Sequence, residues 1–382
     1  MLFSEILGQD YIKSHLTTST SAGRIPHAQL FVGPEGSGTL PLAIAYAQYL
    51  LCSNTGAENN SGNTACNLKF ENLSHPDLHF VFPVATNSEV KSHPVSNNFL
   101  KQWREFIAQT PYGSLFDWYK KIDIANKQGQ IGVDEAGEIV KALSLKAYEG
   151  GYKVMIIWMA DRMHTAAANK LLKLLEEPPQ KTVFLLITEK EEDILQTILS
   201  RCQVLHFNSL PEQVIADALV SREKLDAAAA MKLAHQAQGN YNRARHLLHK
   251  TTDEFPFEEW FVMWVRAAFR AKGNAAAIND LIAWSEQIAA IGREAQKQFL
   301  EFCINMFRQA LLLNYKTNTL VYMEPTVDKF KLENFAPFVN GNNINEIFKE
   351  LSDALYHIER NGNSKIILTD LSIKLTRLIH KK

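Results

Sequence analysis

A glycine-rich segment early in the chain has the spacing of a phosphate-binding loop. Gly33 and Gly38 are five positions apart, Gly36 lies between them, and a short apolar run precedes them. A strand, a glycine-rich turn and a helix form the context in which backbone N–H groups surround phosphate oxygens. A working loop continues with Lys, which neutralises the β and γ phosphates, and then with Ser or Thr, which ligates magnesium. Thr39 and Leu40 stand there instead, so the loop lacks both groups.

A second stretch that should carry acids also lacks them. In a hydrolysing site of this type, a buried strand ends in two acidic residues, one for magnesium and one that activates water. The apolar run 154–157 is followed by Trp158 and Met159, and the first acid is Asp161. The loop alone could be an ordinary strand-to-helix turn, but two matching losses favour a nucleotide site that has been retired. The sequence therefore predicts no ATP hydrolysis and no bound nucleotide cofactor.

The elements around these residues have the pattern of an α/β domain. Residues 154–159 and 183–187 are uninterrupted apolar runs, which suit strands of a parallel sheet covered on both faces. Between them, Thr165 is the expected N-cap of a helix over 166–177, which ends at the Pro178-Pro179 pair. A strand, a helix and a strand in this order predict a right-handed crossover within a parallel sheet.

Composition limits the class of protein. The chain has 382 residues, of which 46% are hydrophobic, so it can form two or three domains with ample core. A formal net charge of −1 argues against a chain that binds nucleic acid alone through a large basic face, although a local basic patch is compatible with it. The four cysteines are widely spread and do not suggest a disulfide scaffold, so the expected location is the cytoplasm. No signal peptide or membrane helix is expected.

Several motifs together resemble the bacterial clamp-loader subunits of the AAA+ class, over roughly residues 1–250. They are His27 to Gly38, His75-Pro76-Asp77, Tyr152 to Ile157, Ala167 to Pro179 and Ser200-Arg201-Cys202. The resemblance implies an α/β fold: an AAA+ type P-loop domain with a parallel sheet over 1–208, then a small helical lid domain over 209–250, then an all-α collar (oligomerisation) domain over 253–382. Apolar residues at helical spacing also predict that the lid and the collar domains are helical. The expected helices are 212–222, 225–238, 241–248, 257–272, 275–290, 293–313, 344–360 and 365–379.

The degenerate loop makes the chain more similar to the non-hydrolysing branch of this family than to the motor subunits called gamma or tau. The resemblance implies a subunit of DNA polymerase III that helps an ATP-driven, hetero-oligomeric ring load the sliding clamp on primed DNA. The implied partners are clamp-loader ATPase subunits and a delta subunit, with clamp and DNA contacted through the assembly. Two alternatives stay open. One is an active DNA-dependent ATPase of the gamma or tau kind, and the other is a DNA-repair AAA+ relative.

The resemblance gives Arg201 a catalytic role. In clamp loaders the arginine of the Ser-Arg-Cys motif projects into the ATP site of the neighbouring subunit, as an arginine finger in trans. A guanidinium stays charged at any working pH and can spread positive charge over a transferring phosphate. The alternative is an arginine that pairs at a strand edge. Ser200 and Cys202 are motif context, and Cys202 is expected to be a small buried residue rather than a nucleophile. Arg243 falls at the sensor-2 position, where it is expected to be a surface or interdomain residue.

The chain departs from the family in two places. A four-cysteine zinc module often follows the loop helix, but here only Cys52 and Cys66 are present, and with His75 they do not supply four ligands. No zinc or other metal is expected, and residues 53–64 suggest an exposed loop. Residues 81–130 form an insertion, expected to be a packing decoration with its own small core; a patch that touches DNA or a partner is the alternative. Its aromatic residues include Trp103, Phe106, Tyr112, Phe116, Trp118 and Tyr119.

Overall fold

The computed structural model describes residues 1–52, 64–148, 151–249, 255–317, 320–323, 325 and 327–381. The chain divides into two compact units. The first consists of residues 1–124 and 129–249, and the second of residues 125–128 and 250–382. Within the described ranges, no helix combines the length and the apolar character that crossing a membrane requires.

The first unit is built on a five-stranded parallel sheet with the strand order β2-β3-β4-β1-β5. All the pairings are parallel, and β1 lies between β4 and β5. The strands are β1 (Ala28–Val32), β2 (Leu78–Val81), β3 (Lys153–Trp158), β4 (Thr182–Thr188) and β5 (Gln203–His206). The parallel α/β sheet expected from the apolar runs is confirmed, and each of those two runs is a strand within one residue of its predicted ends.

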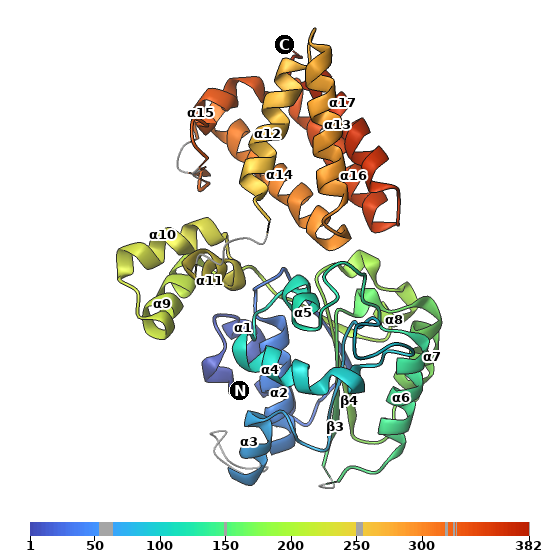
Figure 1. Ribbon diagram of the computed structural model, residues 1–382. Coiled ribbons are helices and arrows are strands. Elements are labelled where there is room, and N and C mark those ends of the chain that lie inside the picture. Colours follow the sequence, from blue (N-terminus) through green and yellow to red (C-terminus); the bar gives the residue numbers. More distant parts are fainter. Residues whose placement is uncertain are drawn as a thin grey trace. The chain divides into compact units, whose positions relative to one another are not determined.

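Helices cover both faces of the sheet, as Figure 1 shows. Alternate residues of β3 point to opposite sides: Val154 and Ile156 belong to one apolar cluster, and Met155 and Ile157 to another. The first cluster includes residues of α1 (Asp10–Ser21), α2 (Thr39–Cys52) and α3 (Thr64–Glu71), and the second includes α6 (Val133–Ser144), α7 (Thr165–Glu176) and α8 (Gln196–Leu199). Burial on both faces explains why the interior of β3 and of β4 is entirely apolar.

The start of α7 differs from the prediction by one residue. The helix begins at Thr165, and its N-cap is His164, whose Nδ1 accepts a hydrogen bond from the Ala166 N–H at 3.2 Å. The prediction that Thr165 is the N-cap is therefore wrong. An imidazole nitrogen can accept a hydrogen bond from a free N–H of the first turn, as a hydroxyl does. In a sequence, however, a histidine indicates the start of a helix less clearly than a threonine does.

The insertion is a part of the main core, and the expectation of a separate small core is wrong. Its helices are α4 (Leu100–Gln109) and α5 (Leu115–Lys121). Trp103 and Trp118 are fully buried and belong to the same cluster as β3. The ring of Trp103 stacks on Phe82 with centroids 4.1 Å apart and lies 5.2 Å from Trp158 at the end of β3. Because the other aromatic side chains of the insertion are also buried, its rings are not an exposed contact patch.

A buried carboxyl group ties the insertion to α6. Glu135 is 2% exposed, and its Oε2 accepts a hydrogen bond from the Ser96 N–H at 2.6 Å. Ser96 in turn binds the backbone of Phe82 through its hydroxyl, which accepts from the Phe82 N–H at 3.0 Å. Burial raises the pKa of Glu135 to about 7, so the carboxyl holds its proton more tightly in the folded chain than in the unfolded chain.

This carboxyl should make the sheet unit less stable as pH rises. Below pH 4.5 both states are protonated, and from there to about pH 7 the folded state binds more protons, so stability falls with rising pH. The change corresponds to at most about 3 kcal/mol. In E135Q the amide oxygen can still accept from Ser96, and this component of the pH dependence should disappear. Denaturant unfolding of the wild-type and E135Q chains at pH 5 and pH 8 measures it. An equal pH dependence in both chains would rule out this assignment.

The lid helices belong to the first unit and have a small core of their own. They are α9 (Glu212–Glu223), α10 (Ala227–Ala237) and α11 (Tyr241–His249). Their core is rich in alanine and leucine and also contains Tyr112 of the insertion. Each lid helix begins and ends within two residues of its prediction. The bounds predicted for separate lid and collar domains stay predictions.

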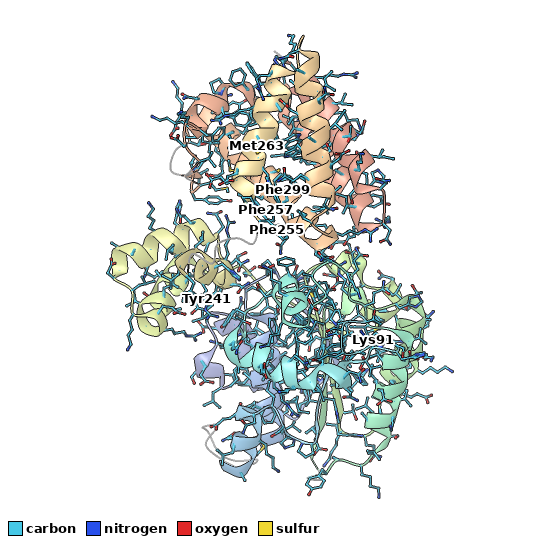
Figure 2. All side chains as sticks on the ribbon, in the orientation of Figure 1. Lys91, Tyr241, Phe255, Phe257, Met263 and Phe299 are labelled. Carbon is cyan, nitrogen blue, oxygen red and sulfur yellow. A yellow bond between two sulfur atoms is a disulfide. The ribbon has the colours of Figure 1, made fainter. Side chains whose placement is uncertain are left out.

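The second unit is all-helical in its described part. Its five longer helices again lie within two residues of the predicted ranges, whereas α15 has no counterpart among them. Its core contains Trp264 and Trp284, which stack with centroids 4.9 Å apart, and the rings of Phe257 and Phe299 (Figure 2) lie 5.6 Å apart. The helices are α12 (Phe257–Arg270), α13 (Ala275–Ala289), α14 (Arg293–Asn314), α15 (Leu332–Phe335), α16 (Ile344–Glu359) and α17 (Ser364–Leu378).

Cys52 at the end of α2 and Cys66 in α3 form a disulfide, with Cα atoms 5.5 Å apart. The cysteine spacing does not suggest a disulfide scaffold, and it did not predict this single pair. Their separation of 14 residues does not reveal that two packed helices bring the sulfurs together. Cys202 and Cys303 are free thiols. The exposed loop predicted for residues 53–64 lies outside the described residues, apart from Thr64, where α3 begins.

Candidate functional site: a closed nucleotide loop and an exposed arginine

The glycine loop connects β1 to α2 at the carboxyl end of the sheet, where parallel α/β proteins bind their ligands. Residues of the loop line a cavity together with Trp158 and Met159 from the end of β3. The cavity has a volume of about 20 Å³. That is room for about one water molecule, whereas sites for small-molecule ligands measure roughly 300–1,000 Å³. The backbone of a phosphate-binding loop is present, and the cavity beside it is small.

Tyr112 of the insertion closes the loop from one side. A Cβ atom at Gly38, which has φ +95°, would lie 3.0 Å from Cε1 of Tyr112. The Tyr112 hydroxyl accepts a hydrogen bond from the Leu7 N–H at 2.8 Å, and the side chain is 5% exposed. Burial raises the pKa of Tyr112 to about 12, so the ring is a neutral phenol. It lies over the glycine backbone to which phosphate oxygens would bind.

The lid closes the loop from the other side. Asn240 precedes α11, where its Oδ1 accepts a hydrogen bond from the Arg243 N–H at 2.9 Å. Its Nδ2 donates to Glu35 of the loop at 3.0 Å. A Cβ atom at Gly36 would lie only 2.0 Å from Asn240 Oδ1, so a larger residue at Gly36 would displace the lid. The lid thus contacts the loop directly.

A second set of polar contacts joins the lid to the insertion. Asp117 in α5 accepts a hydrogen bond from Asn242 Nδ2 at 2.7 Å and pairs with His246 Nε2 at 3.3 Å. Burial alone would raise the pKa of Asp117, but the hydrogen bond and charge of His246, together with hydrogen bonds from Ser114, lower it. The hydrogen bond to Asp117 raises the pKa of His246. Tyr241, labelled on α11 in Figure 2, packs edge-on against Tyr112, with ring centroids 5.0 Å apart.

Glu35 itself is part of the lid contact. Burial raises the pKa of this carboxyl group, and the hydrogen bond from Asn240 partly opposes that shift. An acidic group at the tip of the loop would repel phosphate when it is ionised. Three features of the loop are therefore unlike those of a working phosphate-binding loop: the missing cation at Thr39, the acid at Glu35 and the small cavity.

Asp161, the first acid after β3, makes a structural hydrogen bond away from the loop cavity. Met159 has a left-handed backbone with φ +55°, and the chain continues into the short helix η3 (Ala160–Arg162). Asp161 Oδ1 accepts a hydrogen bond from the Thr188 hydroxyl at 3.0 Å, and burial raises the pKa of Asp161. Asp161 is not among the described residues that line the cavity, although Trp158 and Met159 are. The acid therefore serves the connection between β3 and β4.

Arg201 lies away from the loop, just before β5, and its side chain is 33% exposed. Its Nη2 donates to Glu176 Oε1 at 2.6 Å, and its Nη1 donates to the Thr197 carbonyl at 2.7 Å and to the Ser200 hydroxyl at 3.1 Å. The arginine is thus both paired within the chain and accessible from outside. The Ser200 hydroxyl accepts a hydrogen bond from the guanidinium, which gives the first residue of the Ser-Arg-Cys motif a structural role.

The remaining predicted residues have plainer roles. Burial raises the pKa of Cys202 to about 11, so its thiol is protonated near neutral pH and is a poor nucleophile. Arg243 is half-buried in the first turn of α11. Cys52 and Cys66 are bonded to each other, so they do not fit a zinc module, which needs free thiolates. Among the described residues, no group of three or more His, Cys, Asp or Glu side chains could hold a metal ion.

Sequence reasoning missed the groups that close the loop. Glu35, Tyr112, Asp117, Asn240, Asn242 and His246 all belong to this set. The only local signals are for caps: Ser114 and Asp117 form a capping box for α5, and Asn240 follows a glycine at the start of α11. The spacing of residues can predict that a side chain caps its own helix. It cannot predict that the same side chain also bonds a residue of another element.

A parallel sheet with a glycine loop between β1 and α2, followed by a helical lid, defines a P-loop protein of the AAA+ class. The chain belongs to the DNA polymerase III, delta subunit family, whose model matches residues 8–211. The family predicted from the sequence motifs is confirmed.

Curated relatives agree with this family. The chain is similar to DNA polymerase III subunit delta' of Bacillus subtilis, with 31% identity over 215 residues, which are 56% of this chain and 52% of that protein. It is also similar to the delta' subunit of Escherichia coli, with 30% identity over 209 residues, 54% and 50% of the two chains. DNA polymerase III subunit gamma/tau of Mycobacterium tuberculosis shares 29% identity over 220 residues, 58% and 31% of the two chains. The chain spans about half the length of the delta' relatives it matches.

Proposed function

We propose that this chain is a non-hydrolysing subunit of a replicative clamp loader, and that it supplies Arg201 to the ATP site of a neighbouring subunit. Membership of the DNA polymerase III, delta subunit family supports the first part. The observation that carries the proposal is the loop cavity of about 20 Å³, which is lined by Tyr112 and Trp158, next to the contact of Asn240 with Gly36 of the loop. A chain that cannot hold a nucleotide can still act on the nucleotide of a neighbour.

The proposed partners are the ATPase subunits and a delta subunit of a hetero-oligomeric ring. The helices of the second unit would supply contacts within that ring, and the sliding clamp and primed DNA would be contacted by the assembly. A net charge of −1 supports this division, because a chain that binds DNA alone would need a larger basic surface. No metal or nucleotide cofactor is proposed for the chain itself.

The proposed chemistry is electrostatic. As ATP is hydrolysed, negative charge develops on the transferring phosphoryl group and on the leaving oxygen, and a guanidinium in the neighbouring site stabilises it. Arg201 suits this role because its charge does not depend on pH and its side chain is partly exposed. Ser200 would hold the guanidinium in place, and Cys202 would pack beneath the motif.

A clamp-loading assay tests the proposal. ATPase subunits, delta subunit, clamp and primed DNA are combined with and without this chain, and clamp loaded on DNA is counted. We expect loading only when the chain is present, and no ATP hydrolysis by the chain alone. Hydrolysis by the lone chain would instead support the alternative of an active motor subunit. Unchanged loading without the chain would contradict the proposed role in the ring.

A further inference from the structure

Glu176 is the last residue of α7, and its carboxylate contacts the guanidinium of Arg201 at 2.6 Å. We propose that Glu176 is a positioning residue, which sets the orientation in which Arg201 meets the phosphates of a neighbouring subunit. The inference rests on the proposed function, because it assigns a partner residue to the arginine finger. Glu176 itself does not touch the nucleotide in this proposal.

The donors of the guanidinium divide into used and unused groups. Arginine has five N–H donors in a planar fork. Nη1 donates to the Thr197 carbonyl and to the Ser200 hydroxyl, and Nη2 donates once, to Glu176. Within the part of the chain that the structure describes, the Nε–H and the second Nη2 hydrogen have no acceptor. A phosphate oxygen could therefore be bound without breaking the contact with Glu176.

The acceptors are fixed by the core beneath them. Leu171 and Leu175 of α7 and Ile198 of α8 are buried in one apolar cluster. Glu176 follows Leu175 directly, and Thr197 precedes Ile198. The carboxylate and the carbonyl that hold the guanidinium thus come from two helix ends with anchored backbones. The carboxyl end of a helix also favours a cation.

An exposed ion pair of this kind contributes little to stability, because both side chains are screened by water. The exposed fractions of the two side chains, 33% for Arg201 and 48% for Glu176, place it in that class. The ion pair instead restricts the orientation of the Arg201 guanidinium. A free arginine side chain must lose rotamer freedom when it binds a phosphate, whereas Arg201 is already held by three acceptors.

The proposal predicts a loss of rate without a loss of nucleotide affinity. In E176A the guanidinium keeps its charge but loses one of three acceptors, so ATP hydrolysis at the neighbouring site should slow about tenfold, with KM unchanged. In E176Q an amide oxygen replaces the carboxylate oxygen as acceptor, and most of the rate should return. Glu177 is the matched control, because it is exposed, follows Glu176 directly and is not one of the three acceptors of the guanidinium among the described residues.

The test is single-turnover ATP hydrolysis by the reconstituted ring, with E176A, E176Q, E177A and R201A chains compared at several ATP concentrations. We expect slow hydrolysis with R201A, an intermediate rate with E176A, and rates near wild type with E176Q and E177A. Thermal unfolding of each chain checks that the variants fold. A wild-type rate with E176A, or equal slowing with E176A and E176Q, would overturn the positioning role while R201A still supports the finger. A wild-type rate with R201A would instead overturn the proposed function.

Discussion

Replacing Arg201 by Ala should slow ATP hydrolysis at one site of the assembled ring by about a thousandfold. The guanidinium is the only part of this chain proposed to reach a partner's nucleotide, and its contribution is made to the transition state. ATP binding to the ring should therefore stay the same while the rate falls. R201K keeps a positive charge but loses the planar fork that Glu176, Thr197 and Ser200 hold, so it should restore only a small part of the rate.

Single-turnover hydrolysis distinguishes this result from a general loss of activity. With the wild-type chain, all ATPase sites of the ring should hydrolyse ATP. With R201A, one kinetic phase of hydrolysis should become slow while the other phases keep their rates. Arg24, an exposed arginine of the same unit, is the matched control, and R24A should behave like wild type. If R201A leaves every phase unchanged, Arg201 serves only its ion pair with Glu176. If all phases slow together, the effect comes from ring assembly rather than from one site.

The second large effect is expected from Trp103→Ala. The indole is fully buried and packs against Phe82, Phe106, Trp118 and Trp158. Its removal leaves a cavity at the place where the insertion joins β3, and should lower the free energy of unfolding by about 3–5 kcal/mol. W103F should cost less, because it keeps an aromatic ring and removes an indole N–H that has no hydrogen-bond partner among the described residues.

Amide hydrogen exchange of β3 and β4 measures this loss in the sheet unit alone, which matters because the chain has two compact units. We expect faster exchange in W103A, a smaller change in W103F, and none in Y148A, whose ring is 80% exposed. If β3 and β4 exchange in W103A at the wild-type rate, the insertion does not contribute to the stability of the sheet.

Periodic and local features of the fold could be predicted from the sequence. Strands buried on both faces appear as unbroken apolar runs, and this is why residues 154–159 and 183–187 were found within one residue of β3 and β4. The lid and second-unit helices likewise have apolar residues at helical spacing. Contacts between distant segments leave no such pattern. The disulfide between Cys52 and Cys66 and the packing of Trp103 on Phe82 depend on how elements meet.

The candidate site shows the same division. The missing charges at Thr39 and Leu40 and the indole of Trp158 are visible in the chain and lead to the prediction of a retired nucleotide site. The contacts of Tyr112 and Asn240 with the loop are not visible there, because these residues lie 74 and 202 positions from Gly38 in the sequence. Glu176 was recognised as a part of a motif, but only the structure brings its carboxylate to Arg201.

Isothermal titration calorimetry of the purified chain with ATP and magnesium tests the central claim most directly. The claim is that this nucleotide site is retired, because Thr39 and Leu40 replace its ligands, the cavity lined by Tyr112 and Trp158 measures about 20 Å³, and Asn240 of the lid lies against Gly36. We predict no saturable heat up to millimolar ATP. Saturable binding with a stoichiometry near one would contradict the account, and would mean that the lid opens and that the loop still holds a nucleotide.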